Sequence, residues 1–195
     1  MRWTRGLKIG FEGKRFRLIP IEERYIDAGW LDWLNDPERT RFIETKANYR
    51  REDVLEYLNL QDFNTNFMFA IHNRDDGNYI GNARLSSVDY VNRSCKYGRL
   101  LSPRCPPGLG IGEEILKMIW WFGFEIVGVD LIHSAANERN VASVVSNLKA
   151  GAHIVGFDYW EIPNRGRQPV VKFEIYGREM VYPDQYHLVN PEESS

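Results

Sequence analysis

The feature that most constrains this chain is the segment 103–112, PRCPPGLGIG, which leads directly into the helix-forming stretch 113–122. Proline and glycine favour a loop, and glycine also lets the backbone approach a ligand closely. A helix N-terminus offers unpaired N–H groups and a partial positive charge. The segment is therefore suited to bind an anion such as a phosphate group. A tight turn without a ligand is the alternative.

Three kinds of glycine loop compete for this segment. A P-loop ends in Gly-Lys-Ser/Thr, but here Gly112 is followed by Glu113. A dinucleotide loop has the spacing GxGxxG and an acidic residue ending the next strand. Here the spacing is GxGxG, and Asp130 precedes the apolar segment 131–136. A pyrophosphate loop of the pattern R/Q-x-x-G-x-G/A fits better, because Gly110 and Gly112 match its glycines.

Three further segments carry recognisable motifs: RFRLIP at 15–20, WLDWLNDPE at 30–38 and NVASVVSNLKAGA at 140–152. With the glycine loop, they follow the order and spacing of the GNAT N-acetyltransferases. The chain resembles this family over residues 15–180. Its opening resembles the branch containing ribosomal-protein alanine and amino-sugar acetyltransferases. Ala152 stands where the family usually has Phe.

The composition predicts one folded domain over residues 1–182 and a polar tail over 183–195. The 43% of hydrophobic residues can build a sizeable core, and the net charge of −2 gives no general attraction to nucleic acid. No apolar run approaches the roughly 20 residues that cross a bilayer, so we expect no membrane association. The first residues lack the apolar core of a secretory signal. Cys95 and Cys105 form no metal or redox motif. We therefore expect a cytoplasmic protein without a metal.

Hydrophobic periodicity predicts an α+β fold with a central mixed, mostly antiparallel sheet and helices on both faces, which the resemblance also implies. The predicted strands are 16–20, 67–72, 79–90, 95–101, 131–136, 153–162 and 170–176. The predicted helices are 22–34, 51–60, 111–127 and 140–149.

The resemblance implies acetyl-CoA as the cofactor. Its pyrophosphate would bind the N–H groups of the glycine loop, and a backbone N–H before the loop would polarise the thioester carbonyl. Arg104 is either a phosphate partner or a solvated cation, and Asn140 either contacts the pantetheine arm or simply caps a helix. The residues expected to contact the cofactor are Leu100, Leu101, Arg104, Gly108, Leu109, Gly110, Ile111, Gly112, Asn140 and Ser143.

Three positions depart from the family pattern. Pro107 replaces a cationic or amide residue of the loop and lacks an N–H donor. Asn147 stands where many members have a Tyr that protonates the leaving thiolate. Lys96 stands where related branches have a Glu.

Glu44 and His133 remain as acid–base candidates. Glu44 lies in a segment expected near the acceptor site, where it could bind an ammonium group or accept its proton through water. His133 lies on the strand expected to flank the thioester, and histidine titrates near neutral pH. A solvated carboxylate and an ordinary sheet histidine are the alternatives.

The implied activity is direct transfer of acetyl from acetyl-CoA to the primary amine of a small molecule. An amino sugar or sugar nucleotide is favoured as the acceptor. Acetylation of a protein N-terminus is one alternative, and a non-catalytic acyl-CoA sensor is another. A homodimer is compatible with the sequence.

Overall fold

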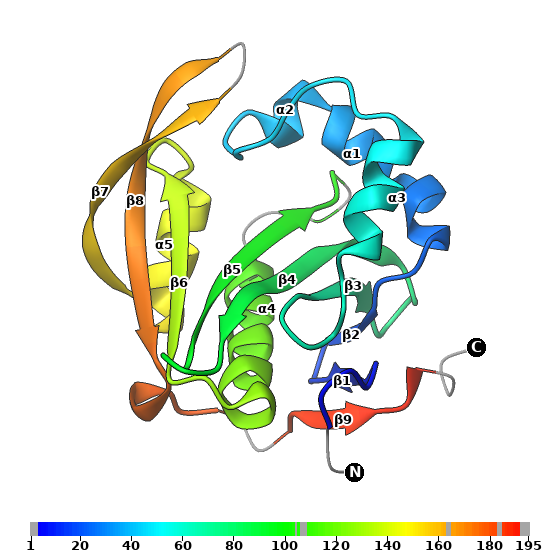
Figure 1. Cartoon of the computed structure of the whole chain (residues 1–195), viewed down its shortest axis with the longest axis vertical. Coiled ribbons are helices and arrows are strands. Elements are labelled where there is room, and N and C mark those ends of the chain that lie inside the picture. The colour runs from blue at the N-terminus through cyan, green and yellow to red at the C-terminus, as the bar shows by residue number, and fades with distance from the viewer. Residues whose placement is uncertain (1–3, 104, 106–108, 163–164, 183–184, 192–195) are drawn as a thin grey trace.

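The computed structural model describes residues 4–103, 105, 109–162, 165–182 and 185–191. Within these residues, nine strands form one sheet in the order β7-β8-β6-β5-β4-β3-β2-β1-β9 (Figure 1). The strands are β1 (Gly10–Glu12), β2 (Phe16–Pro20), β3 (Phe67–Asn73), β4 (Tyr79–Asp89), β5 (Ser94–Leu101), β6 (Leu131–Asn137), β7 (His153–Ile162), β8 (Gly166–Tyr176) and β9 (His187–Val189). In this described part, β5 and β6 form the one parallel pair.

The helices are α1 (Leu31–Asn35), α2 (Pro37–Thr40), α3 (Arg51–Asn59), α4 (Ile111–Trp121) and α5 (Val141–Ala150). A π-helical segment, Ile26–Trp30, precedes α1, and another, Phe122–Val127, extends α4. Asp36 begins α2 because its side chain accepts hydrogen bonds from two backbone N–H groups of the first turn.

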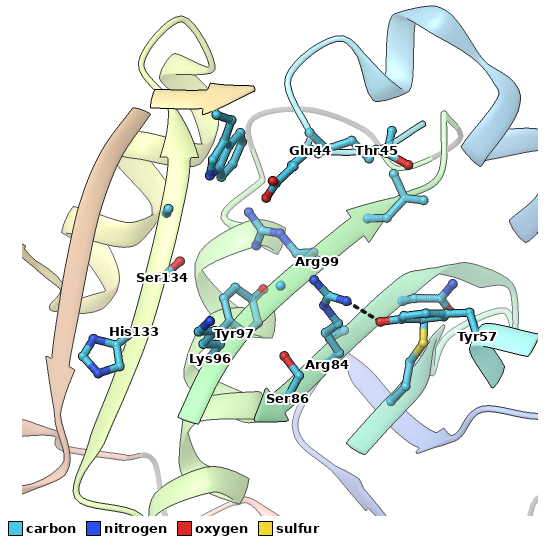
Figure 2. Close-up of a pocket in the computed structure, with 18 of the residues that line it drawn as sticks. Glu44, Thr45, Tyr57, Arg84, Ser86, Lys96, Tyr97, Arg99, His133 and Ser134 are labelled. Atoms are coloured by element: carbon cyan, nitrogen blue, oxygen red, sulfur yellow. Dashed lines mark hydrogen bonds between the residues drawn. The ribbon is translucent and has the colours of Figure 1, made fainter. Parts of the chain in front are cut away.

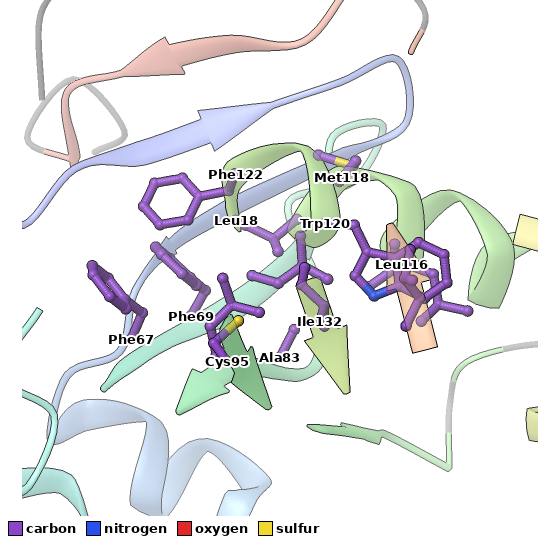
Figure 3. Packing of buried hydrophobic residues seen from close by; sticks show 14 of the residues in the cluster. Leu18, Phe67, Phe69, Ala83, Cys95, Leu116, Met118, Trp120, Phe122 and Ile132 are labelled. Carbon is purple, nitrogen blue, oxygen red and sulfur yellow. The ribbon is translucent and has the colours of Figure 1, made fainter. Parts of the chain in front are cut away.

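Helices cover both faces of the sheet, because alternate strand residues point in opposite directions. On β2, Leu18 packs into the core beneath α4, whereas Ile19 packs into a smaller cluster beneath α1 and α3. The larger core is rich in aromatic rings, and Trp120 and Phe122 are fully buried in it (Figure 3). The predicted α+β fold is confirmed.

Two details differ from the sequence-based expectation. The helix predicted over 22–34 is interrupted at Gly29, whose φ of 132° is not helical. The ring of Trp33 packs so closely against Gly29 that a Cβ atom there would lie 3.0 Å from it. Within the segment expected to be a loose tail, His187–Val189 forms β9 and pairs with β1. Strands of three residues are too short to show alternation, so only their mutual pairing defines them. The division between a domain and a tail at residue 182 stays a prediction.

Candidate active site

A cavity opens where the two central strands separate. Parallel pairing joins residues 94–96 of β5 to residues 131–133 of β6 and ends there. Beyond this point β5 continues beside β4, and β6 continues beside β8. The opening belongs to a cavity of about 1200 Å³ that β4, β5, β6 and the α2–α3 loop all line (Figure 2). A cavity of this size can hold an extended ligand.

Backbone donors of β5 face this opening. In an antiparallel ladder, alternate N–H groups point toward the partner strand. The N–H of Ser102 donates to the carbonyl of Ile80 at 2.8 Å, so the N–H of Leu100 points toward β4 as well. The N–H groups of Leu101 and Arg99 therefore point toward the opening. Of the two predicted leucines, Leu101 has the better-placed donor.

Helix α4 begins beside the opening with two glycines. Gly110 precedes the helix with φ 69°, a left-handed conformation that glycine adopts without strain. Gly112 lies in the first turn, where a Cβ would lie 3.0 Å from Ser146 Oγ and 3.1 Å from Arg99 Nη1. The N–H groups of this first turn, including that of Ile111, have no partner inside the helix. The helix end can therefore receive an anion closely.

Arg15 holds Leu109, which lies two residues before the start of α4. Its Nη1 donates to the carbonyl oxygen of Leu109 at 2.9 Å, and its Nε lies 2.5 Å from the carboxylate of Glu114. Glu113, the other carboxylate of the first turn, pairs with Lys117 at 2.8 Å. The acidic residues of this helix end are thus neutralised by partners of the chain itself. No local sequence pattern indicates this role of Arg15, because both of its partners lie more than ninety positions away.

Arg99 adds a cation at the same helix end. Its Nη1 donates to the carbonyl oxygen of Gly112 at 2.5 Å, and its side chain lines the cavity. Two other loop residues predicted to contact a phosphate, Arg104 and Gly108, lie outside the described residues. The choice for Arg104 between a phosphate partner and a solvated cation therefore stays open, and Arg99 supplies a cation at this helix end from the neighbouring strand.

Asn140 and Ser143 cap α5. The Oδ1 of Asn140 accepts a hydrogen bond from the backbone N–H of Ser143 at 3.2 Å. Neither residue belongs to the cavity lining. Asn147 follows one turn later, 2% exposed, and its amide donates to the carbonyl of Ser143 at 2.9 Å. The helix-capping interpretation of Asn140 therefore describes the observed contact, and its role toward a cofactor stays a prediction.

Glu44 lies in the loop between α2 and α3 that forms the roof of the cavity (Figure 2). Its side chain is exposed, and among the described residues it has no hydrogen bond or ion pair. Its carboxylate is thus free to receive a cationic group inside the cavity.

Arg165, at the tip of the β7–β8 hairpin, holds this roof in place. Its guanidinium donates to the carbonyl oxygens of Thr40, Ile43 and Thr45, the last two at 3.1 and 3.2 Å. One side chain thereby fixes the backbone on both sides of Glu44. The sequence carries no signal for this contact, because the partners are 120 to 125 positions apart.

A second brace holds the end of the same loop. The side chain of Asn35 donates to the carbonyl of Tyr49 at 2.9 Å and accepts from its N–H at 2.7 Å. The hydroxyl groups of Thr45 and Tyr49 are 2.7 Å apart. The loop therefore has a fixed shape without regular secondary structure.

His133 lines the far end of the cavity from Glu44 (Figure 2). It pairs across strands with Glu174 on β8, with Nδ1 3.6 Å from the carboxylate, and its side chain is 44% exposed. The structure places the two predicted acid–base residues in one cavity without bringing them together.

The floor of the cavity carries Arg84 from β4 and Lys96 from β5. Arg84 Nη1 donates to the hydroxyl of Tyr57 on α3, as the dashed line in Figure 2 marks. The Arg84 side chain passes over Gly98, where a Cβ would lie 2.8 Å from its Nε. Glycine inside a strand is the sequence signal for such a close approach. No sequence motif pointed to Arg84.

Two buried polar groups of the cavity walls lack partners within the described part of the chain. The amide nitrogen of Asn82, a residue 1% exposed, has none, whereas its oxygen accepts from Tyr79 at 2.7 Å. The hydroxyl of Tyr97 has none either, and burial raises its pKa to about 12. Asn82 thus offers a spare donor beside the cavity.

Within the described ranges, no three His, Cys, Asp or Glu side chains are grouped to hold a metal ion. Over the same ranges, no helix has the length and apolar character to span a membrane.

The family model "Acetyltransferase (GNAT) domain" matches residues 15–153. A comparison with curated proteins gives no match.

Several solved structures share the fold. Spermidine N-acetyltransferase from Vibrio cholerae, in complex with CoA and spermine, superposes with a TM-score of 0.74 at 19% identity, over 85% of this chain and 97% of that chain. A GNAT-family acetyltransferase from Bacillus anthracis gives a TM-score of 0.72 at 16% identity, over 87% of this chain and 99% of that chain. A GCN5-related N-acetyltransferase from Brucella melitensis gives a TM-score of 0.73 at 16% identity, over 90% of this chain and 82% of that chain.

Proposed function

Because the chain belongs to the GNAT acetyltransferase family, as its motifs predicted, we propose that it transfers the acetyl group of acetyl-CoA to the primary amine of a small molecule. An amino sugar or sugar nucleotide is the proposed acceptor. The observation that carries the proposal is the opening between β5 and β6, which has the helix end of α4 at one side and free strand donors along its edge.

The residues present fit an acetyl-CoA molecule. Glycine at 112 lets the side chains of Ser146 and Arg99 pack against the start of α4, and the first-turn N–H groups there suit a pyrophosphate. Arg99 would add a charged donor, and the N–H of Leu101 would align with the pantetheine arm or the thioester carbonyl. When bound, the cofactor supplies an activated acyl thioester.

The acceptor amine would enter beneath the roof. Glu44 has no partner among the described residues, so it can hold the ammonium group and take its proton directly or through water. Because Arg165 fixes the carbonyls on either side, the carboxylate keeps its position toward the opening.

Asn147 favours a second candidate function. Its amide is buried and bonded to the backbone of its own helix, so it cannot serve as the proton donor that many family members have there. A domain that binds acyl-CoA without turnover is therefore the second candidate. Acetylation of a protein N-terminus, by contrast, has no observation that favours it over the small-molecule acceptor.

The proposal is tested by two measurements on the full chain. Acetyl-CoA should raise the melting temperature, because a ligand that binds only the folded state stabilises it. A thiol-release assay with amino sugars, amines and peptides should then show turnover. The absence of a shift at millimolar acetyl-CoA contradicts both candidates, whereas binding without turnover on any amine selects the sensor.

Assembly is measured in the same preparation. One structural relative is dodecameric. We propose a homodimer for this chain, and light scattering at micromolar concentration gives the mass that decides it.

A further inference from the structure

We infer that the acceptor is an amine that also carries an anionic group, a phosphate or a carboxylate, which binds Arg84 and Lys96 on the cavity floor. This inference rests on the proposed function and names the substrate class of the same site. It starts from the charges that the fold leaves without partners.

Arg84 is held in position by its neighbours. The hydroxyl of Tyr57 accepts a hydrogen bond from Arg84 Nη1, and the guanidinium carbon of Arg84 lies 5.8 Å from the centre of the Tyr57 ring. The absence of a side chain at Gly98 provides the space in which the Arg84 side chain lies. Since these partners are neutral, they orient the guanidinium and leave its charge uncompensated.

Lys96 lies beside Arg84 on the same face of the sheet. The register pairs Arg84 with Gly98 and Ser86 with Lys96, so the two cations are diagonal neighbours across adjacent strands. Among the described residues, Lys96 has no hydrogen bond or ion pair. Two like charges this close repel each other, and an anion bound between them removes that repulsion.

The other basic side chains of the cavity differ from this pair. Lys46 lies 2.7 Å from Asp53, Lys172 lies 3.6 Å from Asp158 on the same hairpin, and His133 faces Glu174. Arg99 keeps its charge as well, because a backbone carbonyl is neutral, but it is turned toward the start of α4, where we propose that the pyrophosphate binds. Arg84 and Lys96 therefore form the cationic pair of the described cavity floor that is open to a ligand.

The roof and the floor carry opposite charges. Glu44 approaches from the roof, and Arg84 and Lys96 lie on the strands below it (Figure 2). Glu56, on the exposed face of α3, is the other carboxylate of the lining that has no partner among the described residues. An acceptor with an ammonium group at one end and an anionic oxygen group at the other matches this arrangement. Arginine suits such a group because its planar donors pair with phosphate and carboxylate oxygens.

A polyamine such as spermine, which is bound in one structural relative, fits this floor poorly. Each further ammonium group would approach Arg84 and Lys96 and be repelled by them. The same two residues thus select for an anionic acceptor and against a polycation.

The inference is tested with pairs of amines that differ by one anionic group. The phosphate pair is glucosamine 6-phosphate and glucosamine, the carboxylate pair is 6-aminohexanoate and hexylamine, and spermidine is the polycation. In a thiol-release assay we expect kcat/KM to be about tenfold or more higher for the charged member of at least one pair, consistent with a hydrogen-bonded charge contact. The pair with the larger ratio identifies the anion. The ratio should fall as salt is raised, because the contact is partly exposed.

The variants R84Q and K96Q should each reduce the preferred ratio about tenfold, and K14Q, which removes an exposed charge outside the cavity, should leave it unchanged. Equal kcat/KM within both pairs, or a ratio that K14Q lowers as much as K96Q, overturns the inference while acetyl transfer itself stands.

If no amine is turned over, the proposed function fails, and calorimetric titration of glucosamine 6-phosphate, 6-aminohexanoate and their neutral counterparts decides the inference separately. Binding of an anionic member that R84Q and K96Q weaken supports it. Equal binding of charged and neutral members, or no binding of either, contradicts it.

Discussion

The two halves of the cavity are built by different means. The half around α4 consists of regular elements whose backbone groups face the opening, with glycines where close packing is needed. The half around Glu44 is a loop without regular structure, held by side chains from distant parts of the chain. Backbone geometry is costly to disturb, whereas a side-chain brace can be removed while the fold remains. Changes in the first half should therefore reduce stability, and changes in the second should reduce acceptor use.

The largest effect is expected for Gly81→Ala, on β4, where Gly81 pairs with Leu101 of β5. A Cβ there would lie 2.6 Å from the carbonyl oxygen of Leu100 and 3.0 Å from the Cα of Leu101, so the backbone of β5 must move. We expect the free energy of unfolding to fall by about 2–3 kcal/mol, as for overpacked sites. Urea denaturation measures it. Gly156→Ala is the matched control, since nothing lies within 4 Å of its Cβ. Equal stability of the two variants would show that the backbone of β5 can move to accommodate the added Cβ at little cost in free energy.

Glu44→Gln should act on catalysis and leave the fold intact. If the carboxylate takes the amine's proton, kcat/KM for the acceptor should fall about 100-fold, the lower range for general bases. The affinity for acetyl-CoA and the melting temperature should stay the same. Glu56→Gln, which removes another carboxylate of the cavity lining, is the control. An unchanged kcat/KM would remove Glu44 from the site.

Arg165→Ala should loosen the roof. Because three carbonyl groups lose their donor, we expect the KM for the amine to rise about tenfold, with acetyl-CoA affinity unchanged. Steady-state kinetics with each substrate varied in turn separates the two effects. Arg167→Ala, on the same hairpin, should behave as wild type, because among the described residues Arg167 contacts only Glu161, at 3.8 Å, and the ring of Tyr159. A matching loss of acetyl-CoA affinity would mean that the two halves are coupled.

The smallest effect is expected when the pH is lowered, and it involves His72. The ring of His72 lies against Tyr25, which belongs to the smaller cluster beneath α1 and α3. Burial lowers the pKa of His72 below its usual 6.5, so the folded state favours the neutral ring. Its contribution to stability is complete above pH 6.5 and is lost as the pH falls below that value, because the unfolded chain binds the proton more tightly. The melting temperature should therefore drop between pH 7.5 and 5.5, and less so in His72→Gln. An identical drop in that variant would exclude His72 as the cause.

Periodicity located most of the strands and the long helices, because a buried face imposes its pattern on neighbouring residues. It placed the strand over 16–20 as the structure has it, and the end of the α4 region at Val127. It missed the break at Gly29, where the packing of Trp33 sets the backbone, and the pairing of β1 with β9, which joins the two ends of the chain.

The family, the α+β fold and the glycine-led helix could be predicted from the sequence, since each depends on residues close together in the chain. Which groups surround the cavity depends on how distant segments fold together. Arg165 reaches Thr40 across 125 positions, and Arg84 lies over Gly98 because two strands pair in one register. Such contacts depend on where the folded backbone brings distant segments, and no local pattern records that. The glycine-led start of α4 and Glu44 were therefore foreseeable from the sequence, whereas the neighbouring positions of Arg84 and Lys96 on the cavity floor became visible only in the folded chain.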